Sequence, residues 1–395
     1  MKTDVVIVGS GCAGLYAALK FPEEINVLIV TKTEAEASNS FLAQGGICIW
    51  KNEEDYDAYL EDTLRAGHYE NDRRSVEIMI TSSQEVIANL IVYGVCFERD
   101  GDGDFLYTRE GGHSEKRILF YKDCTGREIT GKLLEEVRKR SNITLLEHTE
   151  MTDIIEKDSV CRGIRVRTGS EELKDIRADF TILACGGLGG SYPRSTNFRH
   201  IRGDAFEIAD RHGIELKDMD HVQIHPTTLY LENYSDRSFL ISESVRGEGA
   251  RLYGKNMESF VDELLPRDLL TDAIYERMEK DNMPFVWEDM RMIPKQLLKD
   301  HFPNIISFCK EKGFDVFKEC IPVVPAQHYL MGGIKTDHSG RTSMKDLYAV
   351  GETACNGVHG RNRLASNSLL ESLVFAGRAV SDIRINVYKR GVRNV

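Results

Sequence analysis

A glycine-rich turn near the N-terminus has the first residue spacing that points to chemistry. The segment Gly9-Ser10-Gly11-Cys12-Ala13-Gly14 fits the pattern G-x-G-x-x-G. In such a turn the first glycine permits a tight bend, the second lets the backbone approach a pyrophosphate, and the third allows close packing of a helix on a strand. The free N–H groups of the following helix then face the phosphates. The motif therefore predicts a dinucleotide site.

The residues on either side of this turn show how specific the motif is. An apolar run over 4–8 precedes it, a helical pattern follows through 15–19, and a second apolar run covers 27–30. This order of strand, turn, helix and strand is that of a mononucleotide-binding βαβ unit. An NAD site usually has an acidic residue after the second strand, whereas here Val30 is followed by Thr31 and Lys32. This departure weakens the NAD interpretation, and the motif alone leaves FAD and NAD open.

A second group of candidate residues consists of cationic side chains later in the chain. They are His225, Arg246, Arg267, His328 and Arg363, each beside glycine, proline or small residues. A guanidinium binds a carboxylate through two parallel hydrogen bonds. Taken singly, an arginine is more often a surface ion-pair partner and a histidine more often a hydrogen-bonded structural residue. Beside a nucleotide site, the group as a whole predicts a pocket for a carboxylate ligand.

The overall composition limits the possible classes of function. The 51 Lys and Arg against 63 Asp and Glu give a net charge of −12, which argues against nucleic acid or an anionic membrane as a partner. No apolar run approaches the roughly 20 residues that span a bilayer, and the N-terminus enters a strand directly, so a soluble, cytoplasmic protein is expected. The nine cysteines are scattered without a CxxC pair, which predicts reduced thiols and no metal site.

The elements that must position these residues follow an α/β order. A chain of 395 residues is long enough for two domains or for one domain with an insertion. The patterns predict two helices between 50 and 95, strands at 143–146, 163–166 and 180–183, and a closing helix from 369 to about 385. After a mixed segment, an apolar strand at 347–350 runs into Gly351 and Glu352. The expected fold class is α/β, and α+β overall: a Rossmann-like domain formed by 1–218 and 331–395, with an α+β domain inserted at 219–330.

A series of short motifs occurs in one order along the chain. These are 38–46 (SNSFLAQGG), 109–114 (REGGHS), 185–187 (CGG), 203–204 (GD), 225–227 (HPT), 246–249 (RGEG), 266–268 (PRD), 328–333 (HYLMGG), 351–352 (GE) and 362–369 (NRLASNSL). In this order they resemble the flavoproteins of the fumarate reductase/succinate dehydrogenase superfamily over nearly the whole chain, and within it most closely the branch that oxidises L-aspartate. The resemblance implies FAD as the cofactor and a capping, substrate-closing role for the inserted domain.

By this resemblance, FAD contacts the glycine turn, a lysine after the second strand, the segment that follows and four later positions. These residues are Gly9, Ser10, Gly11, Cys12, Ala13, Gly14, Lys32, Asn39, Ser40, Phe41, Leu42, Ala43, Gln44, Gly45, Gly46, Asp204, Glu352, Ser368 and Leu369. Membrane-bound relatives have a flavin-linking histidine where this chain has Asn39. Noncovalent binding of FAD is therefore expected.

The same resemblance assigns the substrate site. The residues expected to bind substrate, apart from Glu110, are His225, Ser242, His328, Arg363 and Ser366. Arg267 is expected to act as proton donor or acceptor, with a purely electrostatic role as the alternative. Glu110 separates the branches of the superfamily, because a carboxylate can pair with the α-ammonium that aspartate carries and succinate lacks.

The function implied by the resemblance is the oxidation of L-aspartate to iminoaspartate, with O₂ or fumarate as electron acceptor, as the first step of de novo NAD biosynthesis. The first alternative is a soluble fumarate reductase acting on succinate-type dicarboxylates, and the second is a flavin-binding protein without catalysis. A quinolinate-forming enzyme is the expected consumer of the product, and the protein is expected to be a monomer or homodimer. Many members of this branch continue into a C-terminal helical domain, which is expected to be absent here.

Overall fold

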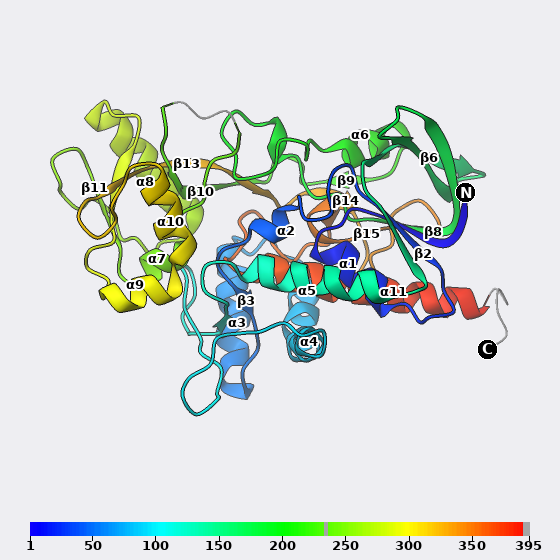
Figure 1. Cartoon of the computed structure of the whole chain (residues 1–395), viewed down its shortest axis with the longest axis horizontal. Helices are drawn as coiled ribbons and strands as arrows, with labels where there is room; N and C mark the ends of the chain where they lie inside the picture. Colours follow the sequence, from blue (N-terminus) through cyan, green and yellow to red (C-terminus); the bar gives the residue numbers. More distant parts are fainter. Residues whose placement is uncertain (233–235, 390–395) are drawn as a thin grey trace.

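A seven-stranded sheet forms the centre of the structure, a computed structural model that describes residues 1–232 and 236–389. Its strand order is β5-β2-β1-β8-β7-β6, and β15 also pairs with β8 (Figure 1). Strands β5, β2, β1, β8 and β15 are parallel, whereas β6, β7 and the first half of β8 form an antiparallel meander. The strands are β1 (Lys2–Val8), β2 (Val27–Val30), β5 (Ile143–Leu146), β6 (Thr149–Lys157), β7 (Val160–Thr168), β8 (Leu173–Leu183) and β15 (Leu347–Ala349).

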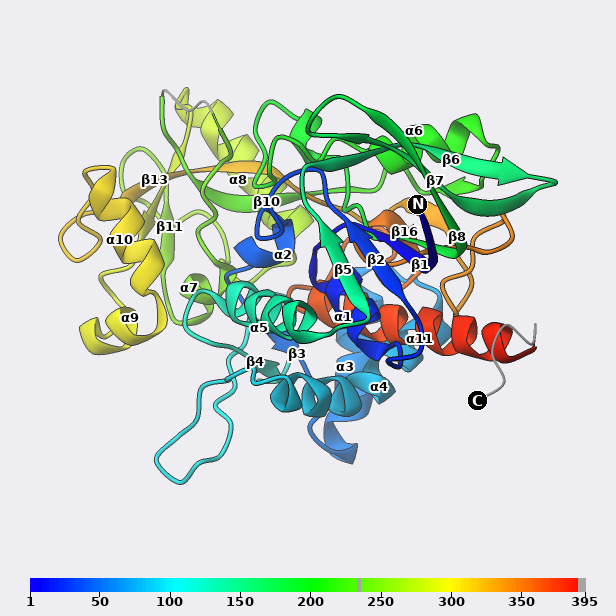
Figure 2. The ribbon, with the colours of Figure 1, turned by 45° about the vertical axis from the view of Figure 1, so that its right-hand side comes forward.

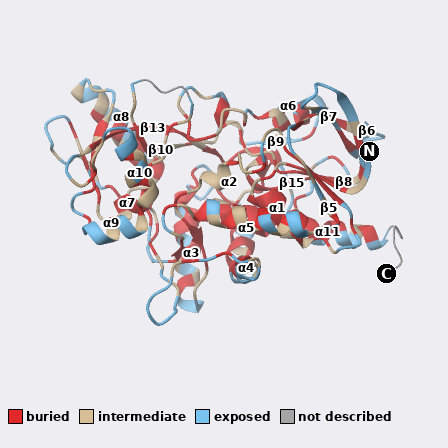
Figure 3. Ribbon diagram, in the orientation of Figure 1, coloured by how far each residue is buried: buried red, intermediate tan, exposed pale blue. Residues whose placement is uncertain are grey.

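Both faces of the parallel strands are covered, which explains why they are continuous apolar runs in the sequence. Val5 and Ile7 belong to a core shared with helices α1 (Cys12–Lys20), α5 (Thr125–Lys139) and α11 (Asn367–Lys389). Val6 and Val8 belong to a second core on the other face, shared with the meander and with α6 (Asp204–Arg211). Figure 3 shows α1 and α11 largely buried along this sheet. The predicted α/β class and Rossmann-like arrangement are confirmed.

Two longer helices, α3 (Glu53–Ala66) and α4 (Arg73–Val92), pack on each other, and α4 also packs on α11. The helical pattern between 50 and 95 predicts both helices. Each begins at a side-chain cap, because Asn52 and Asp72 accept hydrogen bonds from backbone N–H groups one turn ahead. The short helix α2 (Asn39–Leu42) precedes β3 (Ile47–Cys48), which pairs with β4 (Ile118–Leu119). Glu110 lies on the connection between α4 and β4.

A second, four-stranded antiparallel sheet lies apart from the first, on the left of Figure 1 and again in the turned view of Figure 2. Its order is β10-β13-β12-β11, and a third hydrophobic core drawn from residues 229–323 lies against it. The elements are β10 (Val222–Leu229), β11 (Arg251–Tyr253), β12 (Val286–Asp289), β13 (Ile321–Leu330), α7 (Glu243–Gly247), α8 (Arg267–Asp281), α9 (Lys295–His301) and α10 (Pro303–Glu311). The expected boundaries at 219 and 330, and the capping role, stay predictions.

A small three-stranded sheet connects the two parts of the chain. It has the order β16-β14-β9 and comprises β9 (Leu216–Lys217), β14 (Gly333–Lys335) and β16 (Ala354–Cys355). Single 3-10 turns cover Gly189–Ser191 and Gly351–Thr353. Among the described residues, no helix is both long and apolar enough to cross a bilayer.

Candidate active site

The turn between β1 and α1 opens onto a long cavity. Gly9 has a φ of +113°, and a Cβ there would lie 2.0 Å from the carbonyl oxygen of Ala184, so only glycine fits at this position. Gly11, Cys12 and Ala13 line the cavity where α1 begins. The start of a helix bordered by glycines favours a bound phosphate. This geometry fits the pyrophosphate of a dinucleotide.

Most of the predicted cofactor residues line this cavity. They are residues 9–13, Lys32, residues 39–44, Asp204, Glu352, Ser368 and Leu369. Gly14, Gly45 and Gly46 do not line the cavity, but each lets another part of the chain come close to its Cα. An added Cβ would lie 2.1 Å from the Gly9 carbonyl oxygen at Gly14 and 2.5 Å from a Glu110 oxygen at Gly45. At Gly46 it would lie 2.3 Å from atoms of Ile118 and Leu119. Ser38 Oγ and Gln44 Oε1, which belong to lining residues, are buried without a hydrogen-bond partner in the described part of the chain. The cavity thus offers free polar groups to a ligand, and its residues fit FAD.

Three polar residues fix the walls of this cavity. Lys32 forms ion pairs with Asp204 and, at 3.1 Å, with Glu150. The buried carboxylate of Glu352 accepts a hydrogen bond of 2.9 Å from the Leu330 N–H, and burial raises its pKa to about 7. Asn39 donates to the side chain of Asn197 at 2.7 Å, and an amide offers no ring nitrogen for a covalent flavin bond. Noncovalent binding of FAD stays a prediction.

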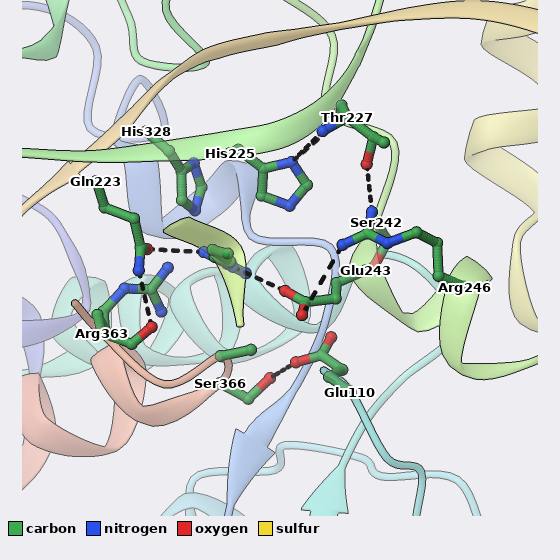
Figure 4. A network of polar contacts seen from close by, with 12 residues as sticks. Glu110, Gln223, His225, Thr227, Ser242, Glu243, Arg246, His328, Arg363 and Ser366 are labelled. Atoms are coloured by element: carbon green, nitrogen blue, oxygen red, sulfur yellow. Dashed lines mark hydrogen bonds and ion pairs between the residues drawn. The ribbon is translucent and has the colours of Figure 1, made fainter. Parts of the chain in front are cut away.

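Arg267 lies at the centre of the cationic cluster predicted from the sequence. It is the first residue of α8, and its Nε donates to Glu243 Oε2 at 2.7 Å while its Nη1 donates to Gln223 Oε1 at 2.9 Å. The amide of Gln223 in turn donates to the Arg363 carbonyl at 2.8 Å (Figure 4). Glu243 and Gln223 therefore hold the Arg267 guanidinium from two sides.

The two predicted histidines lie side by side, with ring centroids 5.2 Å apart. His328 Nδ1 lies 2.7 Å from the Thr196 hydroxyl. His225 Nδ1 lies 3.2 Å from the Thr227 N–H (Figure 4). The Nε2 of His225 is buried and has no partner among the described residues. Burial and the charge of Arg267 hold the pKa of both imidazoles well below the ordinary range. Neutral rings that can donate one hydrogen bond to a carboxylate are the expected forms.

Arg363 and Ser242 complete the proposed carboxylate clamp. Arg363 Nη1 donates to Ser368 Oγ at 3.0 Å, its guanidinium stacks over the Tyr329 ring, and its buried Nε has no partner within the described residues. Burial and the charge of Arg267 lower the pKa of Arg363 to about 10, so it still carries a positive charge at neutral pH. Ser242 is buried and caps α7. The structure thus brings four of the five predicted residues, His225, Arg267, His328 and Arg363, into one cluster.

Glu110 lies beside this cluster, on the loop before β4. It is 3% exposed, and one of its oxygens accepts a hydrogen bond from Ser244 at 2.7 Å. The other accepts a hydrogen bond from Ser366 at 2.6 Å (Figure 4). Burial and the nearby Glu243 raise the pKa of Glu110, while the two hydroxyls and Arg267 oppose this rise. A buried carboxylate is thus held next to arginines that suit a dicarboxylate.

The sequence-based reasoning missed Gln223, Glu243 and Ser244. Arg246, which it did single out, lies behind the cluster: its Nη1 donates to Thr227 Oγ1 at 2.5 Å, and its Nη2 is 3.8 Å from Glu243 Oε1. Glu243 precedes Arg246 by three residues on one helical turn, but the sequence does not reveal that both side chains are buried. Nothing in the sequence distinguishes Gln223 or Ser244 from other polar residues.

The cluster borders the cofactor cavity. His328 lines that cavity, whereas His225, Ser242, Arg267 and Arg363 do not. Glu110 lines a second cavity together with Arg65, Arg109, Gly112, His113 and residues 264–266. No group of three or more His, Cys, Asp or Glu suited to a metal ion occurs within residues 1–232 and 236–389.

Comparisons with known proteins agree with this geometry. The family described as FAD binding domain matches residues 4–369. The chain is 49% identical over 380 residues to an L-aspartate oxidase of Clostridium perfringens, covering 96% of this chain and 86% of the relative. It is 45% identical to an L-aspartate oxidase of Clostridium acetobutylicum, covering 100% of this chain and 91% of the relative. The solved quinol fumarate reductase of E. coli superposes with a TM-score of 0.92 at 30% identity, over 100% of this chain and 72% of that one. The fold, the cofactor cavity and these relatives together show that the chain belongs to the L-aspartate oxidase family of FAD-binding proteins.

Proposed function

We propose that this protein oxidises L-aspartate to iminoaspartate, with FAD as its cofactor and O₂ or fumarate as the electron acceptor. The observation that carries the proposal is the buried Glu110 beside the cluster of Arg267, Arg363 and two histidines. The two arginines and the two neutral imidazoles match two substrate carboxylates, and Glu110 matches the α-ammonium of an amino acid. The identity to L-aspartate oxidases, 49% and 45%, supports the same conclusion.

Different residues of this chain have different roles in the reaction. FAD, when bound, supplies the two-electron acceptor for the hydride that leaves the substrate Cα. Arg363, His225 and His328 bind the carboxylates and orient that C–H bond, so the reactants meet in one geometry. Glu110 orients the amino group from the opposite side. The cluster is buried, which excludes water and strengthens every one of these contacts.

Arg267 is the proposed proton-transfer residue. A proton must leave the ammonium as the Cα–H bond breaks, and Arg267 lies at the centre of the cluster between Gln223 and Glu243. Arg267 also forms an ion pair with Glu243 at 2.7 Å, and stabilisation of developing charge is the alternative role. An Arg267→Lys variant separates the two. Retained activity with a shifted pH profile supports proton transfer, whereas an unshifted profile supports the electrostatic role.

We propose that residues 219–330 form the cap of the site. His225, Ser242, Arg267 and His328 lie within this segment, whereas Glu110, Arg363 and Ser366 belong to the rest of the chain. The site is therefore complete only when the two parts meet. Closure over the substrate would assemble the clamp and exclude water in one movement.

The proposal also covers the enzyme that consumes the product and the oligomeric state of the protein. Iminoaspartate is an unstable imine, and we propose a quinolinate-forming enzyme of NAD biosynthesis as its consumer and a monomer or homodimer as the active form. Light scattering of the purified protein measures the assembly. Imine capture in the presence and absence of the second enzyme measures the transfer.

The test of the function is flavin reduction. L-Aspartate added to the FAD-loaded protein without oxygen should bleach the visible flavin spectrum, and O₂ or fumarate should restore it. The alternative is a fumarate reductase, favoured by the similarity to the E. coli enzyme. Bleaching by succinate but not by L-aspartate would establish that alternative instead.

A further inference from the structure

The carboxylate of Glu110 is held by hydroxyls from two separate parts of the chain. Ser244 on α7 donates to Oε1 at 2.7 Å, and Ser366, just before α11, donates to Oε2 at 2.6 Å. All three residues are at least nine-tenths buried. Hydrogen bonds to a charged group are stronger than those between neutral groups, so this pair of donors fixes the direction in which the carboxylate points.

The backbone restricts Glu110 on a third side. An added Cβ on Gly45 would lie 2.5 Å from Glu110 Oε1, so the carboxylate rests directly on this glycine. Ser366 has a left-handed φ of +60° and also accepts a hydrogen bond of 3.1 Å from the Gly46 N–H. A residue held in this conformation and bonded on both sides has little freedom to move away.

Both oxygens of Glu110 still have acceptor capacity. A carboxylate has about four lone-pair positions, and the two serines occupy one on each oxygen. Within the described residues, Glu110 forms no ion pair with a lysine, arginine or histidine. Its charge therefore lacks a direct cationic partner, and an ammonium group is the chemical match for the remaining positions.

Ser244 also connects Glu110 to the residue proposed to bind a carboxylate. The Ser242 hydroxyl lies 3.3 Å from the Ser244 hydroxyl, so a chain of hydroxyls runs from Ser242 through Ser244 to Glu110. The charged and titratable groups around Glu110 are Glu243 on α7, Arg267 on α8, and Arg65, Arg109 and His113 at the same cavity. Ser244 is thus the link from α7, within the proposed cap, to the ammonium end of the site.

We infer that Ser244 is a positioning residue that sets the preference for an amino dicarboxylate over a dicarboxylate without an amine. It acts by fixing the Glu110 carboxylate where the α-ammonium binds. This inference rests on the proposed function. Selectivity then depends on Ser244 together with Glu110 and not on Glu110 alone.

The experiment compares Ser244→Ala with wild type on two substrates. Oxidation of L-aspartate and reduction of fumarate by a reduced dye are measured on the FAD-loaded proteins. The variant should lose about tenfold in kcat/KM for L-aspartate, mainly through KM, because one hydrogen bond to a charged group is lost. Fumarate reduction should stay within about twofold, because fumarate makes no use of Glu110.

Two further variants decide whether Ser244 acts through Glu110. In a Glu110→Gln background, Ser244→Ala should have no further effect on the ratio of the two activities. Ser83→Ala is the matched control, because Ser83 is a buried, hydrogen-bonded serine on α4, outside both cavities, and its loss should leave the ratio unchanged. Equal losses on both substrates, no loss on L-aspartate, or full additivity with Glu110→Gln would overturn the inference. A wild-type protein that does not oxidise L-aspartate would instead overturn the proposed function, and the inference with it.

Discussion

Replacement of Glu110 by glutamine removes one negative charge from the candidate site and keeps the shape of the side chain. Glu110 is 3% exposed, and in the described structure its two direct partners are neutral hydroxyls. The substrate ammonium would therefore be the first full positive charge to contact it. Breaking a buried charge pair by removing one partner costs about 3 kcal/mol or more, which is roughly a 150-fold change in an equilibrium.

The assay for this variant measures two reactions on the same protein. We expect kcat/KM for L-aspartate oxidation to fall by about two orders of magnitude, while dye-driven fumarate reduction is unchanged or rises. The rise would reflect the removal of a buried negative charge from beside an anionic ligand. Bound FAD, measured by its absorbance, controls for folding. A parallel fall in both reactions would refute the reasoning, since it would show that Glu110 supports the structure of the site and does not recognise the amino group.

The remaining predictions test burial, interdomain contact and cofactor attachment. Glu288 on β12 is fully buried, and burial raises its pKa to about 7. The protonated carboxyl contributes stability that is fully present below the unfolded pKa and is lost as the pH rises through 7. Glu288→Gln should therefore raise the urea midpoint at pH 8.5 and change it little at pH 5. Asp123 accepts three hydrogen bonds from Asn304 and Ile305 at the start of α10, so Asp123→Ala should lower the free energy of unfolding by about 1–2 kcal/mol; an unchanged urea midpoint would contradict this. Acid precipitation should release all FAD into the supernatant, and flavin retained in the pellet would show a covalent bond.

The elements predicted best from the sequence are those that a short stretch of sequence determines by itself. The run over 4–8, the glycine turn and the run over 27–30 carry the whole βαβ unit, and the structure places β1, α1 and β2 there. Strand β6 was missed. Its pairing with β7 shifts register twice, between Met151 and Asp153 and between Ile154 and Glu156, so the simple alternation of polar and apolar residues is broken.

The candidate site was predicted through the types of its residues, and its connections came only from the fold. Arg267 and Arg363 could be found because arginines beside proline or asparagine in an ordered set of motifs are distinctive. Gln223 and Glu243 could not, because their role depends on contacts with Arg267, 44 and 24 residues away in the chain. A glutamine or a glutamate has the same appearance in a sequence whether it is buried on an arginine or exposed to water.

The placement of the two buried acids suggests how one scaffold distinguishes dicarboxylates. Glu243 pairs with Arg267 at 2.7 Å and lies 3.8 Å from Arg246, so its charge is compensated within the protein. Glu110 receives only hydroxyl donors in the described structure, so its charge is compensated fully only when a cation binds. A dicarboxylate without an amine would add negative charge beside an uncompensated carboxylate, which disfavours it, whereas L-aspartate brings the missing positive charge. Selectivity would then come as much from repulsion of the wrong ligand as from attraction of the right one.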